Sequence, residues 1–302
     1  MRPGCVRTKQ GGAALLLLLL SLVLALSVAG WRYFNGDMLR NQKMERTTQA
    51  LATAKAALLA RATTREDTPG GLPCPDTNDD GSAELWASGS ECPSYIGRFP
   101  YRTLEMDDLR DGDGERLWYA MSRNFRYAPN PVNASTNSDI TLNGDTSVIA
   151  IVFSAGPPIT GQTARRSDSA SDYLEGSNAT IGSTAFVAGT ITDSFNDIAL
   201  AIRKDEWLNH VARRILGLAR GPDAQVAGAW GNPATGVRGY HKANSQFPDP
   251  PLTTSGTTFD AALTDNNWVA DLTYTKISAD AATLSLGSTS ISVTPCIATP
   301  CP

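Results

Sequence analysis

One short stretch of the chain places oxygen-bearing side chains at alternate positions. Asp76, Asn78 and Asp80 precede a glycine, and Glu84 occupies the ninth position of the same stretch. Alternating carboxylate and amide oxygens before a glycine turn are typical of the first half of a calcium-binding loop. The twelfth position, where such loops place a bidentate glutamate, is Ala87. Calcium is therefore the one cofactor that the sequence suggests, and an Asx-rich surface turn is the competing interpretation.

A second acidic group lies between residues 107 and 115. Two carboxylates can serve as the acid and base of a glycosidase, but nothing in this group selects a pair, and a turn between elements is the alternative. Nucleophilic catalysis has no support, because there is no G-x-S-x-G motif and the only histidines are His210 and His241. The sequence therefore predicts a protein that is not an enzyme.

The overall charge excludes another class of function. The 302 residues include 26 Lys and Arg against 30 Asp and Glu, for a formal net charge of -4, and the basic residues form no run. Nucleic-acid binding needs clustered positive charge that neutralises phosphates. We therefore expect no nucleic-acid partner.

The apolar residues are concentrated near the N-terminus. No charged residue lies between Lys9 and Arg32, and the run Ala13–Gly30 consists almost entirely of apolar helix formers. As a helix this run rises about 27 Å, close to the hydrocarbon thickness of a bilayer. Basic residues precede it, which favours a cytoplasmic N-terminus and a body on the far side of the membrane. A secretory signal peptide cut after Ala29 is the alternative.

An amphipathic segment follows the apolar run. Met44, Leu51 and Leu58 are spaced by seven, with Ala54 on the same face, in a stretch rich in Ala, Leu, Lys and Gln. The pattern predicts one two-part helix over residues 13–61, with a kink or break at residues 35–37, where Asn-Gly-Asp interrupts the helix formers.

Further elements follow in residues 62–302. Arg116 to Met121 and Ser147 to Ser154 have the composition of strands, and the second is apolar enough to be central. Asp205 to Leu218 has apolar residues at helical spacing. From Pro250 onward, alternating Thr- and Ser-rich stretches predict antiparallel hairpins.

The junction KQGGAALLLLLL resembles the leader junction of type IV pilins and type II secretion pseudopilins. The resemblance implies that residues 1–12 are a leader, that a prepilin peptidase cuts after Gly12, and that Ala13 becomes a methylated N-terminus. Most of that family carry Glu at the fifth mature position, where this chain has Leu17. The missing carboxylate resembles the tip subunit of the type II pseudopilus and some minor pilins.

Other segments extend the resemblance to pseudopilin-like bacterial proteins. They are GLPCPDTNDDG, IGRFPYRTLEMDDLRDGDGERLWYAMS, SVIAIVFSAGPP, DYLEGSNA and FNDIALAIRKDEWLNHVARRILG. Their order and spacing carry the resemblance over most of residues 13–220. By resemblance, several pseudopilins use calcium.

Four cysteines remain after the leader, which contains Cys5: Cys74, Cys92, Cys296 and Cys301. An even number in an exported protein implies disulfides, and three pairings are possible. Proximity favours Cys74 with Cys92 and Cys296 with Cys301. A zinc site is the competing interpretation, but the chain has no C-x-x-C spacing.

These observations predict an α+β, pilin-like fold, in which a long N-terminal helix with a membrane-spanning half and an amphipathic half packs on an antiparallel β-sheet. The domains are the leader (1–12), the helix (13–61) and a periplasmic globular domain (62–302). The resemblance implies a minor pilin or pseudopilin-like structural subunit of a type IV pilus or type II secretion pseudopilus. Its expected partners are other subunits, the prepilin peptidase and the bacterial inner membrane, which it crosses once. The alternatives are a signal-anchored or secreted periplasmic binding or structural protein and, less favoured, a secreted carboxylate-dependent hydrolase.

Overall fold

A computed structural model of the chain describes residues 11–84, 91–127, 131–162, 165, 167–221 and 235–295, and the side chains of residues 11–14 and 28–36 lie outside that description. The helices are α1 (Gly11–Thr64), α2 (Lys204–Arg220), α3 (Gly236–Asn244), α4 (Ala261–Thr264), α5 (Trp268–Asp271) and the short 3-10 turns η1 (Arg123–Phe125), η2 (Ala170–Asp172), η3 (Gly176–Ala179) and η4 (Leu252–Thr254). The strands are β1 (Ile96–Arg98), β2 (Trp118–Met121), β3 (Thr141–Leu142), β4 (Val148–Ser154), β5 (Ala185–Phe186), β6 (Ile198–Arg203), β7 (Thr273–Ser278), β8 (Ala281–Leu286) and β9 (Thr289–Val293).

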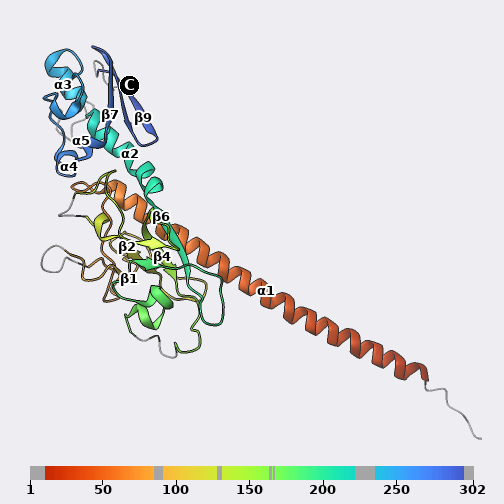
Figure 1. Cartoon of the computed structure of the whole chain (residues 1–302). Helices are drawn as coiled ribbons and strands as arrows, with labels where there is room; N and C mark the ends of the chain where they lie inside the picture. The colour runs from red at the N-terminus through yellow and green to blue at the C-terminus, as the bar shows by residue number, and fades with distance from the viewer. Residues whose placement is uncertain are drawn as a thin grey trace, which may run out of the picture.

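The first helix, α1, runs without interruption from Gly11 to Thr64. Its N-terminal half projects away from the rest of the molecule, and its C-terminal half packs against the central sheet and α2 (Figure 1). The packed half buries Leu51, Ala54 and Leu58 at helical spacing. The predicted break at residues 35–37 is wrong, because a glycine inside a helix costs only about 1 kcal/mol and that cost does not end this helix.

The central sheet has the strand order β1-β2-β4-β6, and each neighbouring pair is antiparallel. Its inner strand β4 is buried along its whole length, as its β-branched and aromatic composition predicts. Ile149 and Val152 face the core shared with α1 and α2, whereas Ile151 and Phe153 face a second apolar cluster. Helices therefore cover one face of the sheet, and the connecting segments between β2 and β6 cover the other.

Helix α2 begins directly after β6. It packs against a three-stranded antiparallel sheet in the order β7-β8-β9 (Figure 1). Asp205 and Glu206 lie in its first turn, where carboxylates favour the helix dipole. It ends at Arg220, and the capping residue Gly221 adopts a φ of +90° that glycine tolerates. The predicted amphipathic helix and the predicted hairpins after Pro250 are confirmed.

The predicted fold class, a helix with a membrane-spanning half packed on one antiparallel sheet, is wrong. In the described residues there are three sheets, and β3 and β5 pair in parallel. Apart from α1 and α2, the helices are short. The parallel pair has two residues in each strand, which is too short for alternation to reveal it in the sequence.

The predicted membrane-spanning half of α1 also needs correction. Among the residues that the structure describes, no helix is both long enough and apolar enough to cross a bilayer. The stretch of α1 with described apolar side chains, residues 15–27, rises about 20 Å, against about 30 Å of bilayer hydrocarbon. The predicted single-pass location in the bacterial inner membrane, with a periplasmic C-terminal domain, is therefore wrong for the described part of the chain.

Candidate functional site

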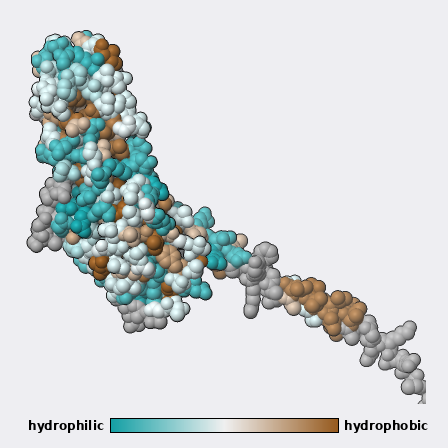
Figure 2. All heavy atoms as spheres, viewed as in Figure 1, coloured by the Kyte–Doolittle hydropathy of each residue, from teal (hydrophilic) through white to brown (hydrophobic). Residues whose placement is uncertain are grey.

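The N-terminal half of α1 presents an apolar surface that nothing else in the described part of the chain covers. Every residue from Leu15 to Leu20 exposes more than half of its surface, as do the large apolar residues from Leu22 to Leu26. Figure 2 shows these residues as a brown stretch along the projecting helix. A contiguous exposed apolar surface of this kind marks an interaction site.

A cavity of about 720 Å³ lies beside α1, where the helix meets the globular part. Its apolar lining comes from Leu39 and Met44 of α1 and from Ile159, Ile191 and Ile198 on the opposite side. Charged side chains also line it, namely Arg40, Lys43, Asp113 and Asp193. We call this cavity the α1 groove. Met44, which the heptad spacing places on the packed face, is 40% exposed and belongs to the groove lining.

The second acidic group forms a turn that contributes Asp113 to the groove lining. One carboxylate oxygen of buried Asp111 accepts the backbone N–H groups of Asp113 and Glu115, and the other accepts the Ser154 hydroxyl at 2.7 Å. Other carboxylates of the group pair with cations: Asp108 with Arg110 and Arg116, Asp113 with Lys43, and Glu115 with Arg165. The arrangement favours the turn interpretation over an acid–base pair.

The same turn holds α1 in place. The Gly112 N–H donates to the Thr47 hydroxyl at 2.9 Å, and the Lys43 ammonium lies 2.6 Å from the Asp113 carboxylate. A Cβ on Gly112 would lie only 2.1 Å from the backbone oxygen of Lys43. Glycine is therefore required for the turn to approach the helix this closely.

The predicted calcium loop is built around the buried carboxylate of Asp76. One oxygen accepts the backbone N–H groups of Asn78 and Asp79 at 3.0 and 2.8 Å, and the other accepts that of Gly81 at 2.7 Å. Burial raises the pKa of Asp76, and these backbone donors oppose that shift. The carboxylate therefore serves as the centre of an Asx turn.

The remaining predicted calcium ligands also have partners. One oxygen of Glu84 accepts both the backbone N–H and the hydroxyl of Thr77, and Asp80 accepts the N–H of Ser82. The side chain of Asn78 accepts the N–H of Asp80. Within the described residues, no three acidic, histidine or cysteine side chains converge as a metal shell. These hydrogen bonds are those of a surface turn, and calcium coordination by Asp76, Asn78, Asp80 and Glu84 stays a prediction.

Two arginines lie beside the Asp79 carboxylate of this loop. The Asp79 carboxylate lies 2.6 Å from the guanidinium of Arg116 and 3.8 Å from that of Arg98. Arg98 is buried, and its guanidinium stacks between the rings of Trp118 and Tyr173 at 4.1 and 4.0 Å. The side chains of Arg98 and Arg116 therefore connect the loop to the central sheet.

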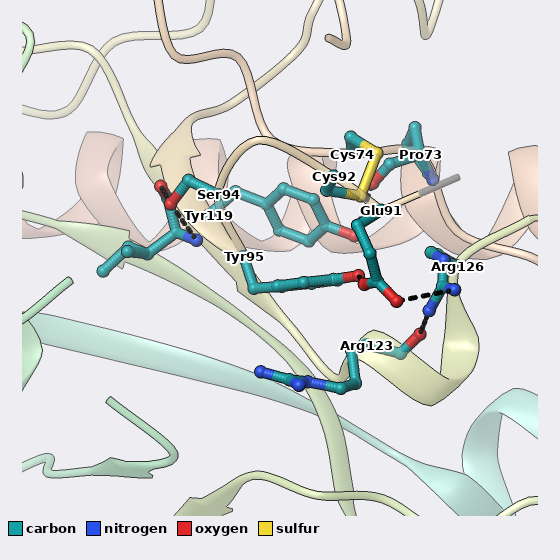
Figure 3. Close-up of a disulfide and its surroundings, with 10 residues drawn as sticks. Pro73, Cys74, Glu91, Cys92, Ser94, Tyr95, Tyr119, Arg123 and Arg126 are labelled. Atoms are coloured by element: carbon teal, nitrogen blue, oxygen red, sulfur yellow. Dashed lines mark hydrogen bonds and ion pairs between the residues drawn. A yellow bond between two sulfur atoms is a disulfide. The ribbon is translucent and has the colours of Figure 1, made fainter. Parts of the chain in front are cut away.

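The predicted pairing of Cys74 with Cys92 is confirmed (Figure 3). Next to it, Glu91 accepts a short hydrogen bond from the Tyr95 hydroxyl and pairs with Arg126 at 3.1 Å. Cys296 and Cys301 lie outside the described residues, so their predicted pairing stays a prediction.

The predicted processing site, Gly12 and Ala13, lies in the first turn of α1, which begins at Gly11. Residues 1–10 of the predicted leader lie outside the described residues. Cleavage after Gly12 would leave almost the whole helix attached to the body, and it stays a prediction.

A set of buried polar residues behind the groove is not predicted by any sequence motif. Glu175, Asn178, Asn196 and Asp197 are all buried and share hydrogen bonds. The one signal that could have found them is a carboxylate immediately before an apolar strand, as Asp197 precedes β6.

Comparisons of the chain with protein-family models, curated proteins and solved structures found no match. The resemblance to pilins and pseudopilins therefore rests on the sequence segments alone and stays a prediction.

Proposed function

We propose that this chain is a minor pilin or pseudopilin-like structural subunit that assembles by packing the apolar half of α1 against the helices of other subunits. The observation that carries the proposal is the division of one continuous helix into a buried half and an exposed apolar half. Complete burial of one leucine side chain contributes about 1.5–3 kcal/mol. A few leucines between Leu15 and Leu26 suffice to offset the entropy lost on association.

The resemblance supplies the rest of the proposal. A prepilin peptidase removes residues 1–12 and leaves Ala13 as a methylated N-terminus. The fifth mature residue is Leu17, so this subunit offers no carboxylate to the N-terminal amine of a neighbour. A position at or near a filament tip fits that difference.

The α1 groove provides a receiving surface for the same assembly. Along α1, Leu20 and Met44 are about 36 Å apart. A second copy offset by that distance would place its apolar half beside the groove of the first. The groove lining and the apolar half of α1 then exclude water from one another.

Charge insertion on the exposed face tests this proposal. Leu18 and Leu22 are one helical turn apart, and both are more than half exposed. In the full chain, Leu18→Lys together with Leu22→Lys should abolish concentration-dependent association in sedimentation velocity. Lysine is a good helix former, so the substitution preserves α1. The control is Gln49→Lys, on an exposed position of the same helix.

A cross-link tests the offset. Copies carrying Leu20→Cys, mixed with copies carrying Met44→Cys, should form a disulfide-linked dimer under mild oxidation. Association that survives the double lysine substitution, or that Gln49→Lys abolishes equally, contradicts the proposal. So does a full chain that binds lipid vesicles but never its own copies. Mass spectrometry of the mature N-terminus should find methylated Ala13, and a start at Gly30 contradicts the processing step.

A further inference from the structure

Two carboxylic acid side chains are buried together behind the α1 groove. Glu175 lies just before η3, and Asp197 lies just before β6; they are 8% and 1% exposed. The backbone N–H of Glu175 donates to the Asp197 carboxylate at 3.0 Å, and the two side chains are within hydrogen-bonding reach of each other. The pair therefore joins two segments that are distant in the sequence.

The donors around the pair leave one oxygen without a partner. Glu175 accepts the Gln162 side-chain amide at 2.5 Å on one oxygen and the Asn196 backbone N–H at 3.0 Å on the other. One oxygen of Asp197, Oδ2, accepts the Glu175 N–H and the Asn178 amide. The other, Oδ1, is buried with no hydrogen-bond donor in the described residues. If Oδ1 carried a proton, it would itself donate a hydrogen bond, and the Glu175 carboxylate would accept it.

No positively charged side chain in the described residues offsets the negative charge of this pair. Among the described residues, neither Glu175 nor Asp197 forms an ion pair with a lysine or arginine. The guanidinium of Arg165 donates instead to the side-chain oxygen of Gln162 at 2.6 Å and lies 3.5 Å from the Glu115 carboxylate. Burial, together with the neighbouring negative charge of Glu175, raises the pKa of Asp197 to about 7, although donors from Glu175 and Asn178 oppose the shift.

Hydrogen bonds connect this pair to the wall of the groove. The Asn196 side-chain amide donates to the carbonyl oxygen of Pro157 at 2.6 Å, and both residues line the groove. Asn178 exchanges hydrogen bonds with the backbone of Val187 at 2.8 and 2.9 Å. Asn178 and Asn196, which donate hydrogen bonds to the two carboxyl groups, therefore also bind the backbone at Val187 and Pro157.

We propose that Glu175 and Asp197 hold one proton between them and act as a pH-dependent clamp on the wall of the α1 groove. The regulatory part of this inference rests on the proposed function of the groove in assembly. With the proton present, the pair carries one negative charge and each buried oxygen has a partner. When the proton is lost, two adjacent buried charges repel each other and loosen the segments around Pro157 and Asn196.

The direction of the pH effect follows from the pKa. The pKa of Asp197 is raised in the folded chain above its ordinary value of 3.8. The folded state therefore binds the proton more tightly than the unfolded chain. Stability from this group is present in full below the unfolded pKa and is lost as pH rises through the folded pKa near 7.

Denaturant unfolding of the full chain between pH 5 and pH 8 tests the clamp. The unfolding constant of the wild type should rise by up to about tenfold per pH unit below pH 7 and level off above it. Asp197→Asn places a permanent donor beside Glu175 and should flatten this profile. The matched control is Asp168→Asn, which makes the same charge change at an exposed position outside the groove and should leave the profile unchanged.

Two further measurements keep the test decisive. If Asp197→Asn does not fold, carbon NMR of the wild-type Asp197 carboxyl reports its titration directly, and a midpoint below pH 5 overturns the clamp. Hydrogen exchange, corrected for its intrinsic pH dependence, should show residues 156–162 and 187–198 opening as pH rises. The proposal is overturned if the unfolding constant depends on pH in the same way in the wild type and in Asp197→Asn. It is also overturned if calcium chloride abolishes the pH dependence by binding the pair.

The readouts separate this inference from the proposed function. Stability and hydrogen exchange report on the clamp whether or not the chain assembles. If both behave as expected but the lysine substitutions on α1 leave association unchanged, the clamp stands and the assembly proposal fails. If association depends on the α1 leucines but not on pH between 6 and 8, the regulatory role fails and the assembly proposal stands.

Discussion

The indole N–H of Trp207 donates a hydrogen bond to the backbone carbonyl oxygen of Gly70 at 2.9 Å, which joins α2 to the turn that follows α1. Trp207 is fully buried and contacts the rings of Phe125 and Trp268, with centroid distances of 5.1 and 5.9 Å. Gly70 has a φ of +96°, and a Cβ there would lie 2.6 Å from the Trp207 ring. The indole thus fits against this turn because Gly70 has no side chain.

Substitution at this contact should be strongly destabilising. We expect Gly70→Ala to lower the free energy of unfolding by about 3 kcal/mol or more, since it combines a clash with the indole and an unfavourable φ. Trp207→Phe should cost about 2–4 kcal/mol, because it leaves a cavity and a carbonyl oxygen without its donor. Denaturant unfolding measures both. The control Gly182→Ala, at a φ of +82° with open space around it, should cost only about 1 kcal/mol. Equal losses at Gly70 and Gly182 would contradict the steric explanation.

A second glycine tests how α1 is held beside the groove. Gly112→Ala should displace the helix near Lys43 and lower the free energy of unfolding by about 2–4 kcal/mol, because the new methyl group meets helix backbone that cannot rotate away. Hydrogen exchange of α1 around residue 47 should increase in this variant. Gly114→Ala adds the same methyl group at a positive φ in open space two residues away, and should leave exchange in α1 unchanged. Increased exchange in both variants would mean that the turn as a whole, and not the close contact, fixes the helix.

The sequence predicts those elements whose residue pattern is long enough to repeat. Strand β4 and helix α2 are recognisable because one is a run of β-branched and aromatic residues and the other buries Trp207, Val211 and Ile215 at helical spacing. The buried face around Leu51 and Leu58 follows from the same rule. The parallel pairing of β3 with β5 is set by contacts across more than forty residues, and no local pattern records it.

The polar sites were harder to predict, because the type of a residue does not show which groups it hydrogen-bonds in the folded chain. Asp76, Asn78 and Asp80 have the spacing of calcium ligands, yet backbone N–H groups occupy the carboxylate of Asp76. Conversely, Glu175 and Asp197 lie in segments without a recognisable binding motif, and folding alone brings them together. Burial decides the chemistry of both sites, and burial of a polar residue is a tertiary property.

The loop around Asp76 yields a prediction that separates the turn from a metal site. Asp76→Ala should lower the free energy of unfolding by about 2–3 kcal/mol, because it leaves buried backbone N–H groups without acceptors. Asp80→Ala, which removes an exposed carboxylate bonded to one N–H group, should cost far less. Thermal unfolding in calcium chloride and in chelator should give the same Tm for the wild type. A lower Tm in chelator that Asp76→Ala and Asp80→Ala both eliminate would instead establish a calcium site.

The disulfide between Cys74 and Cys92 should contribute substantially to stability. The cysteines are 18 residues apart, and closing a loop of that length in the unfolded chain corresponds to about 3 kcal/mol in the chain-entropy description. The double variant Cys74→Ala with Cys92→Ala should therefore unfold at a lower denaturant concentration, by about that free energy. In reductant, the wild type and the double variant should have comparable stability. Reductant should also lower the stability of the double variant further if Cys296 and Cys301 form the second predicted disulfide, and non-reducing peptide mapping of the wild type identifies that pair directly. A double variant as stable as the oxidised wild type would show that the surrounding contacts, such as the pair of Glu91 with Arg126, hold this segment without the covalent link.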